Sequence, residues 1–386
     1  MEIPYQNTST LSLIFTFILF ISSLNLSFST NICHSNDKNV LLGIKSQFNN
    51  ASVFTTWDPV TDCCKNWSGI ECNSNGRVTM LAVSDTNDVI GEIPTSVVNL
   101  PFLQFFTFAV FPGVSGTIPS AIAKLTNLVH LDFSLDNLTG PIPDFLGQLK
   151  NLDVIDLSGN RFTGQIPASL GRLTKLRSAN LGSNQLSGPI PASLGMIKSL
   201  EQLYIYINNL SGPIPLSLAQ LPKLNELSLF QNQLTGSIPE SFGSFKNPAL
   251  NIDLSSNNLS GPIPSSFGKA KITALVLSNN KFSGDASFLF GKDKTVLTTM
   301  DLSNNIFKFD FSNVDLSPGL KNLDISHNMI FGSLPKMLGQ LPLQKLDVSF
   351  NQLCGQIPTG RRLKQFSPSK FSNNKCLCGL PLPACT

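Results

Sequence analysis

The chain has 386 residues, of which 41% are hydrophobic and 13% are charged, and its formal net charge is +3. This composition predicts a sizeable core, and the charge is too small to favour nucleic acid as a partner. The eight cysteines lie in two groups that flank the centre of the chain, which indicates disulfides and an oxidising compartment rather than a cytosolic enzyme.

The N-terminal segment has the character of a signal peptide. Residues 11–28 are almost wholly apolar, and we predict a signal peptide over residues 1–30 with cleavage near Ser29 to Asn31. The first ten residues contain no basic side chain, so an uncleaved anchor is the alternative. Since no second apolar span follows, we expect a secreted, extracellular protein without a membrane anchor or an intracellular domain.

Residues 31–76 are predicted to form a cap. Asp37 precedes a helical stripe that runs from Val40 to Phe48, and we expect Asp37 to cap that helix. Trp57 and Trp67 follow; they could form a platform for a sugar, but plugs over the open end of a core are the more common role for such residues.

The cysteine order suggests how each end is closed. Adjacent Cys63 and Cys64 cannot easily bond each other, and no CxxC pair suggests a metal site, so we expect neither a metal nor another cofactor. The simplest arrangement has the pairs Cys33 to Cys63, Cys64 to Cys72, Cys354 to Cys376 and Cys378 to Cys385.

Residues 77–358 are built from one repeated unit. An asparagine returns every 24 residues at Asn160, Asn184, Asn208 and Asn232, within a pattern LxxLxLxxNxLxGxIP. The pattern continues at spacings of 23 or 25 residues, and Asp136 takes the asparagine position one turn earlier. Counting the rougher turns, the chain has about twelve repeats, which predicts a solenoid rather than two globular domains. The later asparagines are Asn257, Asn280, Asn305, Asn328 and Asn351.

Each part of the unit has a physical explanation. The alternating LxL pair, such as Leu203 and Ile205, predicts a short strand with one buried face, so successive turns can pair in parallel. The asparagine can bond backbone groups that the following bend leaves unpaired. A segment such as residues 168–176 then returns the chain with Leu170 and Leu173 inward. Twelve strands would give a sheet roughly 55 Å long, enough to hold a folded protein.

Five N-glycosylation sequons lie in the mature part. Three of them fall at or just after the asparagine position, so their sugars should sit beside the strand face and not across its middle. The five acceptors are Asn50, Asn66, Asn137, Asn209 and Asn258. Residues 359–386 are predicted to form the C-terminal cap, and the basic run Arg361, Arg362 and Lys364 within it is typical of a solvated loop.

The pattern and the caps carry a resemblance. LxxLxLxxNxLxGxIP is the plant extracellular leucine-rich repeat, and WDPVTDCCKNWSGIEC and CLCGLPLPAC look like the caps that flank such repeats. The segments GDASFLFGKDKT, FKFDFSNVDLSPGLKNLDISHNMIFGSLP and FNQLCGQIPTG are more specific and closely resemble plant polygalacturonase-inhibiting proteins. The irregular GDAS and FDFS turns, which replace two GxIP bends in that order, are the strongest part of this match, which runs from about Cys33 to the C-terminus.

The resemblance implies both a fold and a function. The fold is an α/β solenoid, a right-handed leucine-rich-repeat superhelix with a parallel sheet on its concave face and disulfide-bonded caps. The function is that of a monomeric defence protein of the plant cell wall or apoplast that binds fungal endo-polygalacturonases and covers their substrate cleft, with pectin as a further candidate partner. Family members usually have ten repeats, so two regular turns are extra here.

The concave face can be predicted from the position between the two apolar strand residues. Six of these twelve positions are aspartate, and carboxylates stacked about 5 Å apart would repel one another and favour a basic partner. In a single repeat, such an aspartate is more often an ordinary solvated residue. The row is Ala82, Thr107, Asp132, Asp156, Asn180, Tyr204, Ser228, Asp253, Val276, Asp301, Asp324 and Asp347.

Large rings interrupt the row at its middle, and rings outside a core often anchor interfaces. We therefore expect the energetic centre of binding near Tyr204, Tyr206 and Phe230. The predicted partner-binding residues are His130, Asp132, Asp156, Asn180, Tyr204, Tyr206, Phe230, Gln231, Asp253 and Asp301.

Three other functions are alternatives: an enzyme, a receptor-like module and an ice-binding protein. An enzyme is not expected, because HExxH, GxSxG and GxxxxGK are absent and His130 beside Asp132 has no accompanying nucleophile. A soluble receptor-like module in apoplastic signalling would share the repeat but not the GDAS and FDFS turns. Ice binding, known among close relatives of the inhibitors, would need a regular row of small polar residues, which the concave row lacks.

Overall fold

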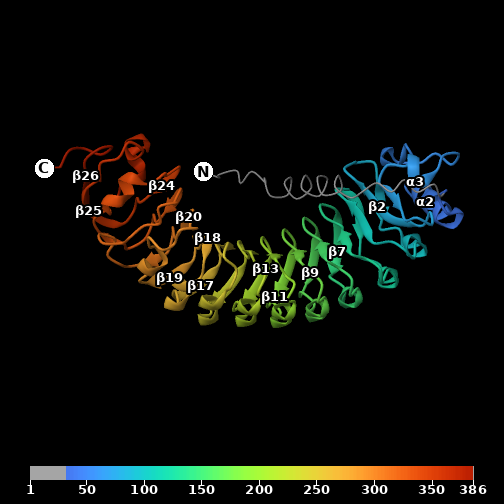
Figure 1. Ribbon diagram of the computed structural model, residues 1–386, viewed down its shortest axis with the longest axis horizontal. Helices are drawn as coiled ribbons and strands as arrows, with labels where there is room; N and C mark the ends of the chain where they lie inside the picture. Colours follow the sequence, from blue (N-terminus) through green and yellow to red (C-terminus); the bar gives the residue numbers. More distant parts are fainter. Residues whose placement is uncertain (1–31, 386) are drawn as a thin grey trace.

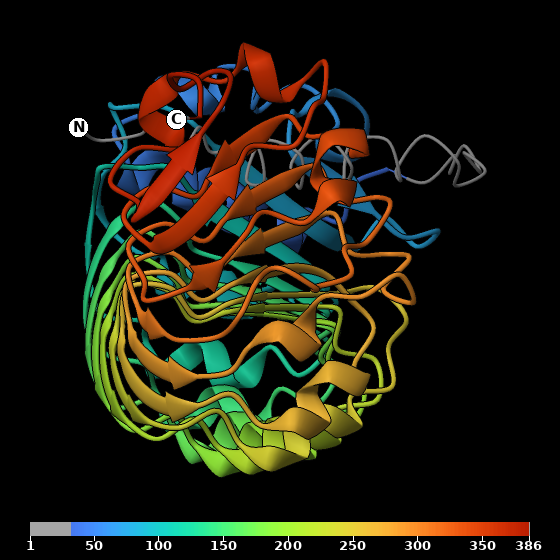
Figure 2. The ribbon, with the colours of Figure 1, turned by 90° about the vertical axis from the view of Figure 1, so that its left-hand side faces the viewer.

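The computed structural model describes residues 32–385, so the predicted signal peptide lies outside the described residues. Within that range, the helices are all too short or too polar to cross a membrane. The chain forms a curved stack with its N-terminal cap at one end and its C-terminal cap at the other (Figure 1). Viewed from the C-terminal end, successive turns follow one another around a common core (Figure 2).

The concave side is a 13-stranded sheet, in which one antiparallel strand of the cap, β1 (Ile70–Cys72), precedes twelve parallel strands. The twelve parallel strands confirm the predicted twelve turns. Each contains the first apolar residue of the LxL pair of its repeat, and in most turns the second follows directly after the strand, as Ile205 follows β12; both are buried. They are β2 (Val78–Ser84), β4 (Phe105–Ala109), β6 (His130–Asp132), β8 (Val154–Asp156), β10 (Ser178–Asn180), β12 (Gln202–Tyr204), β14 (Glu226–Ser228), β16 (Leu250–Asp253), β18 (Ile272–Val276), β20 (Thr299–Asp301), β22 (Asn322–Asp324) and β24 (Lys345–Asp347).

A second, ten-stranded parallel sheet, which the sequence analysis did not predict, covers one side of the stack; we call it the flank sheet (Figure 1). It forms because the xLxG segment after each asparagine is extended and pairs with the segment of the preceding turn. Its strands are β3 (Ile90–Glu92), β5 (Gly113–Gly116), β7 (Asn137–Pro141), β9 (Arg161–Gly164), β11 (Gln185–Gly188), β13 (Asn209–Gly212), β15 (Gln233–Gly236), β17 (Asn258–Pro262), β19 (Lys281–Gly284) and β21 (Ile306–Phe307).

The flank sheet ends at the irregular FDFS turn. Beyond β21, an isolated bridge between Asp310 and Phe331 leads to a separate three-stranded sheet. That sheet contains β23 (Phe331–Gly332), β25 (Gln352–Gln356) and β26 (Cys376–Cys378). The FDFS turn, the most distinctive motif of the sequence, therefore separates the flank sheet from the three-stranded sheet.

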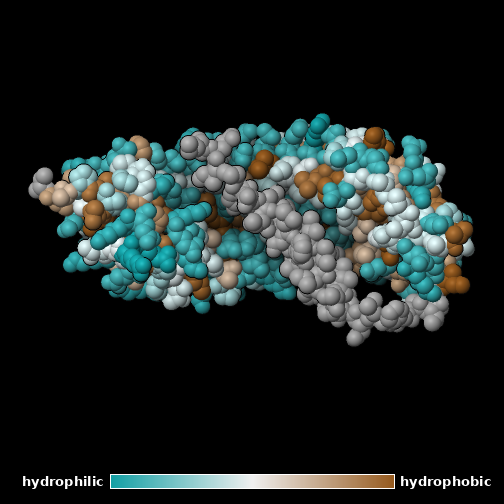
Figure 3. All heavy atoms as spheres, turned by 90° about the horizontal axis from the view of Figure 1, so that it is seen from above, coloured by the Kyte–Doolittle hydropathy of each residue, from teal (hydrophilic) through white to brown (hydrophobic). Residues whose placement is uncertain are grey.

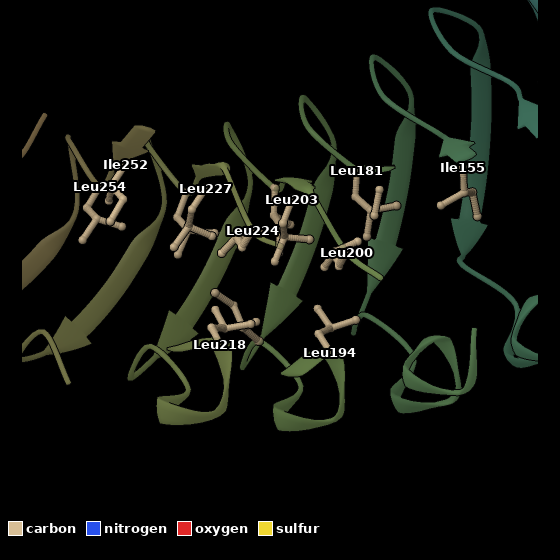
Figure 4. Packing of buried hydrophobic residues seen from close by; sticks show 14 of the residues in the cluster. Ile155, Leu181, Leu194, Leu200, Leu203, Leu218, Leu224, Leu227, Ile252 and Leu254 are labelled. Carbon is tan, nitrogen blue, oxygen red and sulfur yellow. The ribbon is translucent and has the colours of Figure 1, made fainter. Parts of the chain in front are cut away.

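Short 3-10 helices form the convex side, where each begins directly after the proline of its GxIP or GSLP bend, except η10, which follows Ala286 of the GDAS turn. Short connecting segments such as these commonly adopt the tighter 3-10 winding. Leu170 and Leu173 are buried there as predicted. Leu194 and Leu218 of these helices pack toward Leu203 and Leu227 of the concave strands (Figure 4). The helices are η2 (Thr95–Asn99), η3 (Ser120–Lys124), η4 (Asp144–Gln148), η5 (Ala168–Arg172), η6 (Ala192–Met196), η7 (Leu216–Gln220), η8 (Glu240–Ser244), η9 (Ser265–Lys269), η10 (Ser287–Leu289) and η11 (Lys336–Gln340).

The recurring asparagines form a buried ladder that ties each turn to the one before it. The Asn184 amide nitrogen donates to the carbonyls of Leu157, Leu181 and Gly182, and its oxygen accepts the Phe162 backbone N–H at 3.0 Å. Each rung therefore satisfies backbone groups in two turns, which confirms the expected role of the asparagine. The last rung is Asn374, in the C-terminal cap.

The N-terminal cap contains α2 (Ser35–Gln47), η1 (Ser52–Phe54) and α3 (Cys63–Asn66). The prediction that Asp37 caps this helix is wrong. The capping residue is His34, and α2 begins two residues before Asp37. Asp37 is instead buried and bonds both the Arg77 guanidinium, at 2.8 Å, and the Val78 backbone N–H. It thereby fastens the cap to the first repeat strand.

Aromatic packing and disulfides close both ends. Trp57 and Trp67 are buried and stacked with ring centroids 5.4 Å apart, so they act as plugs and not as a sugar platform. The disulfides join Cys33 to Cys63, Cys64 to Cys72, Cys354 to Cys376 and Cys378 to Cys385, the pairs that the cysteine order suggested. The C-terminal cap adds η12 (Leu363–Gln365) and η13 (Pro368–Lys370).

Candidate functional site

The predicted row of side chains is continuous on the concave sheet. The register pairs Asp132 with Asp156, then Asn180, then Tyr204, then Ser228. The remaining members follow in the same way to Asp347. The space-filling view from above, toward the concave side, shows mainly hydrophilic atoms with separate hydrophobic patches (Figure 3).

The aspartates of the row do not present both carboxylate oxygens to solvent. Asp156 accepts the backbone N–H and the hydroxyl of Ser158, at 2.9 and 2.6 Å, and the same pair of bonds recurs in four later turns. The four are Asp253 with Ser255, Asp301 with Ser303, Asp324 with Ser326 and Asp347 with Ser349. One oxygen of each thus closes a local turn. The Asp-x-Ser spacing was the sequence signal for this role.

Burial makes several of these carboxylates weaker acids. Burial, followed by the nearby charge of Asp132, raises the pKa of Asp156 to about 7. Burial also raises the pKa of Asp324 to about 6, with Asp301 and Asp347 adding repulsion, and raises the pKa of Asp253. The negative charge of the concave face consequently grows as pH rises across the neutral range.

The last aspartate finds a basic partner within the chain. The Lys370 ammonium lies 2.8 Å from Asp347, and the backbone of Lys370 accepts the Val348 N–H as the next strand of the sheet would. Lys370 belongs to the cap, so the sequence analysis did not include it in the row. It relieves the repulsion that was expected to require an external partner at that end.

The predicted aromatic centre is an ordered stack. The rings of Tyr206 and Phe230 are parallel, with centroids 4.9 Å apart, and Tyr204 meets Tyr206 edge to face at 6.5 Å. All three side chains are half-buried. On the other side of Tyr206 lies Gly182, where a Cβ atom would approach the Tyr206 ring to 2.6 Å. Several other turns have serine at this position, so the missing side chain of Gly182 makes room for the stack.

Two predicted contact residues, Asn180 and His130, are less exposed than expected, whereas Gln231 is exposed. Asn180 is only 5% exposed and bonds Asp156 and Ser158, so it supports the surface and does not itself offer a contact. His130 is half-buried against Phe105, with ring centroids 6.3 Å apart, and burial lowers its pKa. Gln231 is exposed at a positive-φ corner (54°) just beyond the strand.

Further charged residues, which the sequence analysis missed, surround the aromatic stack. Glu201 comes directly before β12 and Glu226 lies in β14, where burial raises the pKa of Glu226. Arg177 pairs with Asp153 at 2.5 Å across adjacent turns. The predicted row included only the position between the two apolar strand residues. The residues before the first apolar strand residue also lie on the concave face, and these charged residues are among them.

The described residues contain one cluster of possible metal ligands, Cys33, Asp62, Cys63 and Cys64. All three cysteines are disulfide-bonded, and the Asp62 carboxylate accepts the Cys64 backbone N–H. Disulfide sulfur is not the thiolate that binds metals, so these donors do not fit a metal ion.

Four of the five sequon asparagines are exposed, the exception being Asn137, which is half-buried. Asn137, Asn209 and Asn258 each begin a flank-sheet strand, β7, β13 and β17. Glycans at these residues would lie on the flank sheet and would leave the concave sheet open.

These features define a leucine-rich-repeat protein. Family models described as leucine-rich repeat N-terminal domain and leucine-rich repeat region match residues 34–73 and 78–255, and a single-repeat model matches 250–270 and 319–341. The polygalacturonase inhibitor 1 of Arabidopsis thaliana is 43% identical over 98% of this chain and 99% of its own length. The Vitis vinifera inhibitor is 43% identical over 92% of this chain and 91% of its own. The chain therefore belongs to the plant polygalacturonase inhibitor family.

Solved structures agree with this fold. A plant ice-binding protein matches with a TM-score of 0.60 and 35% identity, over 92% of this chain and 99% of its own. The plant peptide hormone receptor RGFR1, solved with RGF2, gives a TM-score of 0.69 and 30% identity, over 78% of this chain and 49% of its own. The matched family models and these inhibitor relatives describe repeat proteins and inhibitors, not enzymes.

Proposed function

We propose that this protein is secreted into the plant cell wall and inhibits fungal endo-polygalacturonases by holding them against its concave sheet. The observation that carries the proposal is the stack of Tyr204, Tyr206 and Phe230 at the middle of that sheet, among acidic side chains. Rings of this kind give large contact area at small entropic cost, which is why they anchor protein interfaces. The inhibitor relatives that match over nearly the full chain support the same function.

Charge gives a reason for the choice of partner. An enzyme that cleaves a polymer of galacturonic acid must bind carboxylates, so its substrate cleft needs basic side chains. Asp156, Asp253, Glu201 and Glu226 offer acidic groups around the rings, and complementary charge favours encounter and fixes orientation. A folded inhibitor seated there would exclude the polysaccharide by covering the cleft, without any chemical step of its own.

A reducing-sugar assay tests the proposal. Several fungal endo-polygalacturonases are assayed with and without the purified protein, and we expect inhibition of at least one. In the Tyr204→Ala variant we expect the inhibition constant to rise at least tenfold, as for interface hot spots, while the unfolding curve stays nearly unchanged. No inhibition of any enzyme by the wild-type protein would refute the function.

Gly182→Ser gives a sharper test of the stack. The added side chain copies the serine of other turns but would displace the Tyr206 ring, so binding should weaken although Tyr206 itself is retained. Met196→Ala, which removes a 65% exposed apolar side chain from the convex side, is the matched control and should bind normally. Equal effects of Gly182→Ser and Met196→Ala would show that the stack is not the anchor.

A second candidate function, ice binding, is favoured by one feature of the flank sheet. In the seven successive turns from Asp136 to Asn280, the third residue after the asparagine position is a hydroxyl in a flank strand, a regularity that the concave row lacks. The row is Thr139, Thr163, Ser187, Ser211, Thr235, Ser260 and Ser283. Glycans at Asn137, Asn209 and Asn258 would lie on the same sheet and obstruct a flat ice surface. Comparing ice recrystallisation with the glycosylated and the enzymatically deglycosylated protein tests this candidate.

A further inference from the structure

An apolar patch interrupts the polar side of the stack where the flank sheet ends. It consists of Ile306, Met329, Phe331 and Phe350, which are 49%, 37%, 37% and 46% exposed, and we call it the flank patch. In seven earlier turns the first and third residues after the asparagine are amides, hydroxyls, a guanidinium or an ammonium. In the two turns after Asn305 and Asn328, three of the four corresponding residues are Ile306, Met329 and Phe331. Contiguous exposed apolar side chains on a soluble protein mark interaction surfaces.

The backbone brings these side chains together. The Met329 and Phe331 backbone N–H groups donate to the carbonyls of Phe307 and Phe309, at 2.9 and 3.1 Å, so residues 329–331 lie directly against the turn that holds Ile306. Phe331 is paired with Gln352 on the next strand. Ile306 precedes the FDFS turn, which replaces a regular GxIP bend between β21 and β23, and Met329 and Phe331 follow it.

The flank patch is continuous with the concave face. Phe350 stacks on the His327 ring, with centroids 4.1 Å apart and planes 13° apart. Both residues have positive φ (53°) at the corner where the chain leaves the concave strand, and both are exposed. Only four residues lie between Asp324 of the concave row and Met329 of the flank patch. A partner that covers the C-terminal half of the concave sheet would therefore contact His327 and Phe350 at its edge.

Charge and glycan positions narrow the choice of occupant. Exposed Lys281, Lys308 and Lys375 lie in the same strands or adjoining turns, so a second copy of this chain would bring lysines against lysines. An occupant with acidic groups around an apolar centre is complementary. The flank sequons lie in β7, β13 and β17 and leave the flank patch uncovered, whereas they would crowd the rest of the flank sheet.

We infer that the polygalacturonase bound on the concave sheet extends around this corner and rests on the flank patch, which forms a second anchor beside the aromatic stack. This inference rests on the proposed function. From β14 to β22 there are four strand steps, roughly 19 Å at the usual strand spacing. A standard interface of about 800 Å² per partner is wide enough to include both anchors.

Binding measurements with an inhibited endo-polygalacturonase test this footprint. The double variant Met329→Ser and Phe331→Ser restores flank residues to the polar type, and we expect its dissociation constant to rise about tenfold with an unchanged unfolding curve. The matched control is Ile90→Ser, at a residue that is 71% exposed in flank strand β3 at the far end of the sheet. It should bind as the wild type does.

Amide hydrogen exchange supplies an independent measurement, and we expect residues 306–309 and 329–331 to be protected in the complex while β9 is not. If Tyr204→Ala weakens binding but the double variant does not and residues 306–309 and 329–331 exchange freely, the flank inference is wrong and the function stands. If the wild type binds no polygalacturonase, both fail. Concentration-dependent dimerisation that the double variant abolishes would assign the patch to a second copy and overturn the inference.

Discussion

Asp136 offers a direct test of the energetics of the asparagine ladder. It takes the asparagine position of its turn, and one carboxylate oxygen accepts the Phe111 backbone N–H at 2.7 Å, as the asparagine oxygens do elsewhere. In the next turn, the Asn160 amide nitrogen donates to the carbonyls of Phe133, Leu157 and Ser158. The second oxygen of Asp136 is buried and has no hydrogen-bond partner among the described residues. When ionised, Asp136 thus has only an acceptor where the asparagines have an amide donor.

The pKa of Asp136 follows from that environment. Burial raises it to about 8 from the ordinary value of 3.8, although the Phe111 N–H opposes the shift. The native state therefore holds this proton up to about pH 8, whereas the unfolded state releases it near pH 4. At pH 7 the difference corresponds to about three pKa units, or on the order of 4 kcal/mol of lost stability at 1.36 kcal/mol per unit. At pH 5 the same reasoning gives about 2 kcal/mol.

Asp136→Asn should remove this cost and supply the missing donor. We expect the urea midpoint of unfolding to rise, by more at pH 7 than at pH 5, and the difference to vanish near pH 4. The reverse exchange one rung later, Asn160→Asp, is the control and should destabilise the protein most at high pH. An Asp136→Asn gain that is absent at pH 7, or of equal size at pH 4 and 7, would refute the reasoning.

Two further predictions concern the ladder and the concave carboxylates. Asn208→Ala leaves the buried Leu186 N–H unpaired and removes one of the two bonds to the Leu181 carbonyl, which keeps its bond from Asn184. It should cost about 3 kcal/mol in denaturant unfolding; a cost below about 1 kcal/mol would contradict the ladder. As pH rises from 5 to 8, Asp156 (pKa about 7) and Asp324 (pKa about 6) ionise, so the affinity for a basic partner should increase. The native state should lose stability over the same range, because above about pH 4 the native state binds more protons than the unfolded chain. Asp156→Asn should flatten both pH profiles, measured by titration calorimetry and thermal unfolding, and an unchanged profile would count against this assignment.

The repeat explains which structural details were predictable. The strand position of Leu203, the bonding role of Asn184 and the inward direction of Leu170 all depend on residues within one unit, and the unit recurs often enough to be identified. The cysteine order suggested the disulfides for a similar reason, since both members of each pair lie at the same end of the stack. Predictions for single side chains at the face were weaker. Asn180 is buried, His130 is half-buried, and Asp37 bonds Arg77 and does not cap its helix.

The sequence by itself determined the class of fold, the twelve turns and the position of the concave row, because these follow from spacing along the chain, and its irregular GDAS and FDFS segments indicated the family by resemblance. Only the tertiary structure decided what each exposed group meets, since its neighbours lie about 24 residues away in the next turn. Gly182 makes room for Tyr206, which stacks on Phe230, and Lys370 of the cap reaches Asp347. The flank sheet, and the apolar patch where it breaks, likewise arise from pairing between turns, which no single repeat contains.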